Sequence, residues 1–270
     1  MTIDYAMSIL AYGETKVGKS TLAVTGPYPR LYLDVEAAAR FLPGVKVKWD
    51  PRNPPPVADG TWDTCVVPCR DFETMLRVYQ WLQLGQHQFK SVAIDSVSEL
   101  QVKCLEQIAG RGQVQTAQWG ELLRAFTGLM RDMRDLTEHP TNPIQAVILT
   151  AMAKEVDGVI KPYIQGQSGV VTPFLFDIVG YIALEEWPNP DPTQPPYKAR
   201  RMYVERTKRF EAGERVQGRL GTVVEQNNLN VEWMLNTVFP QRIAGEQAIA
   251  DAAQSAQDAQ AQTTEAPLSE

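Results

Sequence analysis

The sequence of 270 residues is poor in the residue types that build disulfide frameworks and metal centres. It contains three cysteines and two histidines. Three cysteines are an odd number and too few for a disulfide scaffold. Cys65 and Cys69 have a C-x3-C spacing, but no second pair of ligands follows them, so a zinc site is not predicted. We expect the thiols to stay reduced, as in a cytoplasm.

Long apolar runs are also missing. No run approaches the 18 residues that a membrane-spanning helix needs, and the start Met1-Thr2-Ile3-Asp4 lacks the basic and apolar stretches of a signal peptide. We therefore expect no membrane span and no secretion. Hydrophobic residues make up 44% of the chain and charged residues 21%, which predicts that most of the chain folds.

An overall excess of basic residues is absent, since the formal net charge is -6. Residues 246–270 hold five acidic residues and no lysine or arginine, and without them 26 basic residues face 27 acidic ones. The net charge therefore does not exclude nucleic acid as a partner. Residues 198–219 carry eight basic side chains against three acidic ones: Lys198, Arg200, Arg201, Arg206, Lys208, Arg209, Arg215 and Arg219.

Short β-branched runs alternate with longer amphipathic patterns, which predicts an α/β fold with a largely parallel, twisted sheet flanked by helices. Strands are expected over residues 8–12, 31–33, 64–67, 91–94, 146–149, 178–184 and 202–204. Helices are expected just after residue 18, over 71–84, along 119–136, and after a cap at Asn230. Two proline-rich segments, 43–60 and 188–196, are expected to be surface loops.

The composition changes near residue 244. Beyond it the chain consists mainly of Ala, Gln, Asp, Thr and Ser, and such a segment buries too little apolar surface to offset the entropy of ordering. We predict one folded domain, residues 1–243, and an acidic, Ala/Gln-rich disordered tail, residues 244–270.

One motif carries specific chemistry. The pattern G-x-x-x-x-G-K-[ST] is matched by Gly13, Glu14, Thr15, Lys16, Val17, Gly18, Lys19 and Ser20, and Thr21 follows. Glycines let the backbone N–H groups converge on phosphate oxygens, the lysine reaches the β- and γ-phosphates, and the serine hydroxyl binds Mg²⁺. The motif lies between a predicted strand and a predicted helix, which is the context it requires. The sequence therefore predicts a phosphate-binding loop for ATP and Mg²⁺.

A carboxylate for the magnesium shell follows the apolar strand residues Val92-Ala93-Ile94, at Asp95. Ser96 is either a second group on this shell or a helix cap. Hydrolysis also needs a group that orients or deprotonates water near the γ-phosphate. Asp34 and Glu36, which follow Leu31-Tyr32-Leu33, both qualify.

The order and character of these three segments resemble RecA-type ATPases. The likeness spans about residues 5–235 and is greatest to the compact phage group of RecA-like proteins, often labelled phage AAA ATPases, that act as single-strand annealing recombinases of the Sak type. The resemblance implies a RecA-like core, ATP hydrolysis with Mg²⁺, and single-stranded DNA as a partner. A single-strand-binding protein is a further candidate partner, and the location would be the host cytoplasm.

The resemblance also implies roles for particular residues. It selects Glu36 over Asp34 as the water activator, and it pairs Asp95 with Ser96 at the magnesium shell. The polar sensor after the fourth core strand would be Thr150, where related recombinases carry an amide. Lys208 or Arg209 would reach the nucleotide of a neighbouring subunit, which implies a homo-oligomer.

The resemblance further places mobile DNA-binding loops at residues 154–169 and at Gly110-Arg111-Gly112. No additional DNA-binding domain is recognised at either end of the chain, as in the compact phage group.

Two other classes remain open. A P-loop small-molecule kinase could use residues 198–219 as a basic lid, and a nucleotide-dependent switch or loader would act on a protein partner. A GTPase is disfavoured because the sequence has no N-K-x-D motif, and a transporter ATPase because it has no LSGGQ-like signature.

Overall fold

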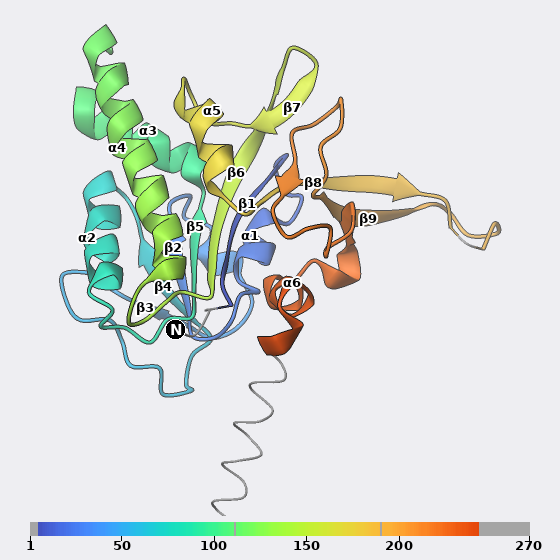
Figure 1. Cartoon of the computed structure of the whole chain (residues 1–270), viewed down its shortest axis with the longest axis horizontal. Helices are drawn as coiled ribbons and strands as arrows, with labels where there is room; N and C mark the ends of the chain where they lie inside the picture. Colours follow the sequence, from blue (N-terminus) through green and yellow to red (C-terminus); the bar gives the residue numbers. More distant parts are fainter. Residues whose placement is uncertain (1–4, 111, 190, 243–270) are drawn as a thin grey trace, which may run out of the picture.

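An 11-stranded sheet runs through the computed structural model, which describes residues 5–110, 112–189 and 191–242 (Figure 1). The strand order is β11-β9-β8-β1-β6-β5-β2-β4-β3, with β10 paired to β8 and β7 paired to β6. All neighbours from β8 to β3 along this order are parallel, and the other pairs are antiparallel. This architecture confirms the predicted α/β fold with a mostly parallel sheet.

The strands have the following bounds: β1 Met7–Gly13, β2 Arg30–Asp34, β3 Lys46–Lys48, β4 Thr64–Pro68, β5 Ser91–Asp95, β6 Ala146–Val156, β7 Val159–Pro162, β8 Ile178–Trp187, β9 Tyr197–Tyr203, β10 Gly213–Glu214 and β11 Val223–Glu225. The α-helices are α1 Lys19–Ala23, α2 Phe72–Gln83, α3 Val97–Ala109, α4 Thr116–Asp135, α5 Ser168–Val171 and α6 Val231–Val238. Short 3₁₀ helices are η1 Ala39–Phe41, η2 Leu136–Glu138, η3 Thr172–Leu175 and η4 Gln226–Asn228.

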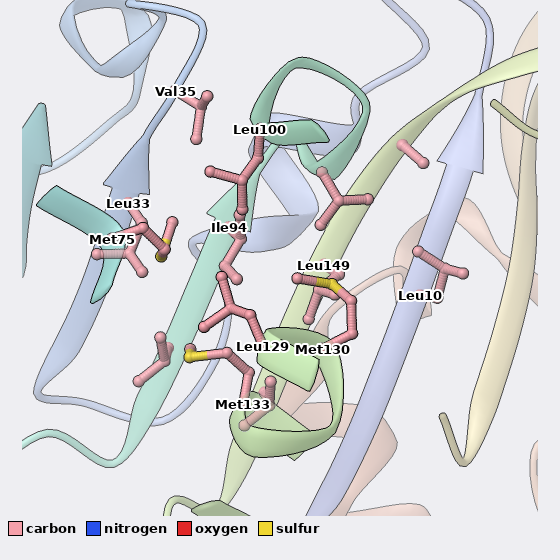
Figure 2. Close-up of a cluster of buried hydrophobic side chains, with 14 of the residues drawn as sticks. Leu10, Leu33, Val35, Met75, Ile94, Leu100, Leu129, Met130, Met133 and Leu149 are labelled. Carbon is pink, nitrogen blue, oxygen red and sulfur yellow. The ribbon is translucent and has the colours of Figure 1, made fainter. Parts of the chain in front are cut away.

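Two hydrophobic cores lie on opposite faces of the sheet. Side chains alternate along each strand, so on β1 Leu10 contributes to the core under α2, α3 and α4, while Ile9 contributes to the core under α1 and α6. Figure 2 shows the first core, where Met130 and Met133 of α4 pack over Ile94 of β5 and neighbouring side chains. The central strands are buried on both faces, which is why they read as continuous apolar runs.

Local signals set the helix boundaries. The Asp71 side chain accepts a hydrogen bond from the Thr74 N–H at 2.7 Å and begins α2. Asn230 accepts from the Trp233 N–H at 3.0 Å and begins α6, as predicted. Along the long helix α4 the large apolar side chains are buried, apart from the half-buried Leu123 and from Trp119 near the start, which is 40% exposed.

The proline-rich segment 43–60 is not entirely a surface loop, contrary to expectation. Its residues Lys46–Lys48 form β3, which pairs in parallel with β4. Trp49 follows at 4% exposure and packs against Trp81 and Phe89. Burying this indole outweighs the loop-forming tendency of the surrounding prolines.

The segment 154–169 also differs from the expected mobile loop. Strand β6 continues beyond the sheet to Val156, turns at Asp157 and Gly158, and returns as β7. Both turn residues have positive φ, 52° and 75°, which is the conformation of a tight two-residue hairpin turn. The second expected loop includes Arg111, which lies outside the described residues, as does the predicted tail 244–270.

No helix in the described part of the chain has the length and apolar character needed to cross a bilayer.

The burial of all three thiols gives a test of the fold. Cys65, Cys69 and Cys104 are free and buried, and burial raises the pKa of Cys65 and of Cys104 to about 12. Because the thiolate is the reactive form, we expect Ellman's reagent at mildly alkaline pH to modify the native protein more than about a hundredfold slower than the protein in guanidinium. A thiol that reacts in the native state at the rate of free cysteine would contradict the described core.

Candidate nucleotide-binding and hydrolysis site

The phosphate-binding motif joins the end of β1 to the start of α1. Gly13 is the last residue of β1, and a Cβ there would lie 2.4 Å from the Ile182 carbonyl oxygen of β8. Gly18 has φ +103°, which a residue with a side chain rarely adopts, and it immediately precedes α1. Both motif glycines are therefore required by the backbone itself, because one approaches a neighbouring strand and the other takes a left-handed turn.

Lys19 folds back over the loop that precedes it. Its ammonium donates to the carbonyl oxygens of Gly13 at 3.0 Å and Glu14 at 2.6 Å. Burial lowers the pKa of Lys19, while the negative charges of Asp95, Glu36 and Glu14 oppose that shift. The structure thus brings Lys19 and both predicted catalytic-site carboxylates, Asp95 and Glu36, into one electrostatic neighbourhood.

Asp95 ends β5 and is 2% exposed. The Tyr32 hydroxyl of β2 donates to its Oδ2 and the Thr150 hydroxyl of β6 donates to its Oδ1. Burial together with the charge of Asp95 raises the pKa of Tyr32, and the nearby side chain of Ser20 opposes that rise. Tyr32 therefore lies beside both residues, Ser20 and Asp95, that are predicted to hold Mg²⁺.

The two acids after β2 occupy different positions. The Asp34 carboxylate accepts from the backbone N–H groups of Ala38 at 2.8 Å and Ala39 at 3.3 Å, so it holds the turn that leads into η1. Glu36 is exposed, and its Oε1 accepts a hydrogen bond from Ser96 Oγ. Of the two carboxylates, Glu36 is the more exposed, and its role as the water activator remains a prediction.

Ser96 has one of the two roles predicted from the sequence, that of a helix cap, and it also contacts Glu36. Its hydroxyl accepts from the Glu99 N–H at 3.4 Å as the cap of α3, and it donates to Glu36. The peptide bond between Asp95 and Ser96 is cis. Ser96 thus connects the end of β5 to the Glu36 side chain, while its role in the magnesium shell remains a prediction.

Thr150 is fully buried, and its hydroxyl is bonded to Asp95. The structure places it beside the predicted metal ligand, so its present contact positions that carboxylate. Sensing of the γ-phosphate by Thr150 remains a prediction.

Lys208 and Arg209 are both exposed beyond the end of β9. Arg209 lines a groove of about 380 Å³ together with Glu14, Thr15 and Lys16 of the phosphate-binding loop in its own chain. Lys208 does not line this groove. The predicted action of either residue on a neighbouring subunit is not tested by these contacts.

Sequence reasoning did not find Tyr32 as part of the site. Tyr32 stands between two leucines in an apolar strand, so it reads as a core residue. Its one distinguishing signal is the hydroxyl group itself, since a fully buried tyrosine oxygen needs a partner. The register that sets Asp34 opposite Asp95 on the parallel strands β2 and β5 brings Tyr32 alongside Asp95, and this register follows only from the strand order.

These features together define a P-loop nucleoside triphosphatase. A family model described as an AAA domain matches residues 6–216, and the chain belongs to this AAA domain family of nucleotide-binding ATPases. No curated protein matches the chain.

The contact between Thr150 and Asp95 leads to a testable expectation. Thr150→Val removes one of two hydroxyl donors from a buried carboxylate, whereas Thr150→Ser keeps it. We expect the Thr150→Val substitution to lower the free energy of unfolding by about 1–3 kcal/mol. We also expect it to raise the Mg²⁺ concentration for half-maximal ATPase activity about tenfold. Denaturant unfolding measures the first effect and a magnesium titration of the ATPase activity measures the second. The Thr150→Ser variant should match the wild type in both measurements.

A Thr150→Val protein with unchanged stability and unchanged magnesium requirement, but a reduced kcat, would show that Thr150 acts on the γ-phosphate rather than on Asp95.

Proposed function

We propose that this AAA-domain ATPase hydrolyses ATP with Mg²⁺, binds single-stranded DNA, and promotes annealing or strand exchange in phage recombination as a Sak-type protein. The observation that carries the DNA part is a groove with two opposed lysines and an exposed phenylalanine, built partly on β6, the strand whose Thr150 holds Asp95 in place. The groove lies where the resemblance to RecA-like proteins expects contact with DNA.

The residues of the site fit ATP and Mg²⁺. Gly13 and Gly18 shape a loop whose N–H groups can cradle phosphates, and Lys19 can exchange its carbonyl partners for phosphate oxygens. Ser20 and Asp95, which both lie beside Tyr32, supply a hydroxyl and a carboxylate, which are oxygen ligands that Mg²⁺ prefers. Magnesium would neutralise charge that develops on the transferring phosphoryl group.

Glu36 supplies the general base in this proposal. Its exposed carboxylate is held by Ser96, so one oxygen is oriented and the other can accept a proton from water. The charge of Lys19 lies close enough to influence it. Asp34 contributes by holding the turn that carries Glu36.

The groove of about 770 Å³ lies between the β6–β7 hairpin and the segment that follows β9. Its lining carries four basic side chains and three acidic ones, and two of the basic ones, Lys154 and Lys161, face each other directly across the hairpin. Like charges opposed on two strands repel each other, and a bound polyanion removes that repulsion. Phe174 on the rim is 70% exposed, which suits stacking with an unpaired base.

Helix α3 connects this groove to the hydrolytic site. Ser98, three residues after Asp95, accepts from the Met152 N–H at 3.0 Å and donates to the Tyr163 carbonyl at 2.7 Å. Gln101 exchanges two hydrogen bonds with the backbone of Gln165, at 2.6 and 3.1 Å. A rearrangement at Asp95 would therefore reach the groove through direct bonds, which supports hydrolysis that responds to DNA.

The proposal includes a homo-oligomer in which Lys208 or Arg209 reaches a neighbouring nucleotide, and a single-strand-binding protein as a further partner. The exposure of both cations supports this part of the proposal. The proposed location is the host cytoplasm, where both DNA and a single-strand-binding protein are present.

A small-molecule kinase is the second candidate because of a cavity of about 770 Å³ that borders Glu36. Five basic side chains contribute to its lining, and they would suit an anionic phosphoryl acceptor: Arg40, Lys46, Lys48, Arg70 and Lys103. Hydrolysis indifferent to DNA favours this candidate or a switch that acts on a protein partner.

The first test is steady-state ATP hydrolysis with and without single-stranded DNA, for the wild type, Lys19→Ala and Glu36→Gln. We expect DNA to stimulate the wild type. Glu36→Gln should lose about 10²–10⁴-fold in kcat while still binding nucleotide, because only the proton acceptor is removed. Wild-type hydrolysis that is insensitive to DNA would contradict the recombinase proposal, and Glu36→Gln with full activity would contradict the role of Glu36.

The groove has its own test. The double variant Lys154→Gln/Lys161→Gln should bind an oligothymidylate more weakly and with a smaller salt dependence, since each lost phosphate contact on a single strand lowers the slope by about 0.7. Arg131→Gln, an exposed cation on α4 outside the groove, is the matched control. Equal salt dependence of DNA binding in the double variant and the control would place the DNA elsewhere.

A further inference from the structure

Arg200 of β9 lies directly against the phosphate-binding loop of its own chain. A Cβ built on Gly18 would be 3.1 Å from both Cδ and Nε of Arg200. Gly18 is separated from β9 by about 180 residues of sequence, so the contact is made by the fold and not by chain proximity. Arg200 stood in the basic stretch 198–219, but no sequence signal distinguished it from its neighbours.

The positive charge of Arg200 is not balanced by an ion pair among the described residues. Its Nε is buried, and no acceptor for that N–H lies within reach among the described residues. No acidic side chain in the described part of the chain forms an ion pair with it, whereas its backbone N–H donates to Gln226 Oε1 at 2.8 Å. A buried guanidinium N–H without an acceptor is unfavourable, so the arrangement favours an anion at this position.

The next residue shows the contrast. Arg201 points to the other face of β9, because side chains alternate along a strand. There it pairs with Glu225 at 2.8 Å and stacks over the Trp187 ring at 3.6 Å. Arg201 is thus engaged by an ion pair and an aromatic ring, while the Arg200 side chain on the opposite face lies against the phosphate-binding loop and has no ion pair among the described residues.

We propose that Arg200 binds the α- and β-phosphates of the nucleotide held by that same chain. The N–H groups of a phosphate-binding loop cradle these two phosphates, whereas Lys19 reaches toward the β- and γ-phosphates. A guanidinium beside Gly18 is therefore placed for the part of the nucleotide that ADP and ATP share. Arg200 acts in binding, and it differs from Lys208 and Arg209, which are proposed to act on a neighbouring subunit.

The inference rests on the proposed nucleotide site, and the experiment separates the two. ADP binding is measured by calorimetry for the wild type, Lys19→Ala, Arg200→Gln and Lys198→Gln. Lys198 is the matched control, because it is exposed, carries the same charge and lies two residues earlier on the same face of β9. Circular dichroism and thermal melting confirm that each variant is folded.

We expect Arg200→Gln to weaken ADP and a non-hydrolysable ATP analogue by a similar factor of about ten, as for the loss of one charge-assisted hydrogen bond. The inhibition constant of pyrophosphate, which has no base, measured in competition with labelled ADP, should rise by the same factor in this variant. Lys198→Gln should behave as the wild type.

Unchanged ADP affinity in Arg200→Gln, with affinity lost in Lys19→Ala, would overturn the role of Arg200 and leave the nucleotide site intact. Weaker ADP binding with an unchanged inhibition constant for pyrophosphate would also overturn it, since the contact would then be to the base or the ribose. If Lys19→Ala binds ADP as the wild type does, the proposed nucleotide site itself fails.

Discussion

The buried carboxylate of Asp95 is the constraint on which the site depends. A charge that is 2% exposed is stable only when polar groups surround it, and here two hydroxyls do so, from Tyr32 and Thr150. They come from the strands on either side, β2 and β6, so the order β2-β5-β6 and its register must form before the carboxylate is satisfied. The metal-binding group and the centre of the sheet are therefore specified by the same contacts.

From Asp95, neighbouring side chains extend in two directions. Tyr32, which donates to Asp95, lies beside Ser20 of the phosphate-binding loop, and Ser96, the next residue in the chain, donates to Glu36. Each functional side chain is thus held by a group that also has a structural task, such as the hydroxyl of Ser96, which caps α3. Such supporting contacts hold catalytic groups in fixed geometry.

The parts of the fold and of the site that are determined by short stretches of sequence could be predicted. The phosphate-binding loop, the strand that ends in Asp95, helix α2, the cap of α6 and the α/β class all follow from spacing and residue type. The contact of Arg200 with Gly18 could not be predicted, because it depends on how the β8–β9 pair sits beside β1. The strand at Lys46–Lys48 was hidden by its prolines, since the burial of Trp49 that fixes it is a tertiary effect. Helix α3 was noticed only through its cap at Ser96.

Strand β6 is long enough to carry the β6–β7 hairpin well beyond the centre of the sheet. Between Thr150 and Val156 the strand advances by about 20 Å, at roughly 3.3 Å per residue, from the fully buried centre of the sheet to the tip of the hairpin (Figure 1). A rigid rod pivoted at its inner end converts a small rotation into a larger displacement at its outer end. A tilt of β6 too slight to disturb the sheet would therefore open or narrow the groove. The displacement of the hairpin for a given tilt depends on how far β6 extends beyond the neighbouring strands.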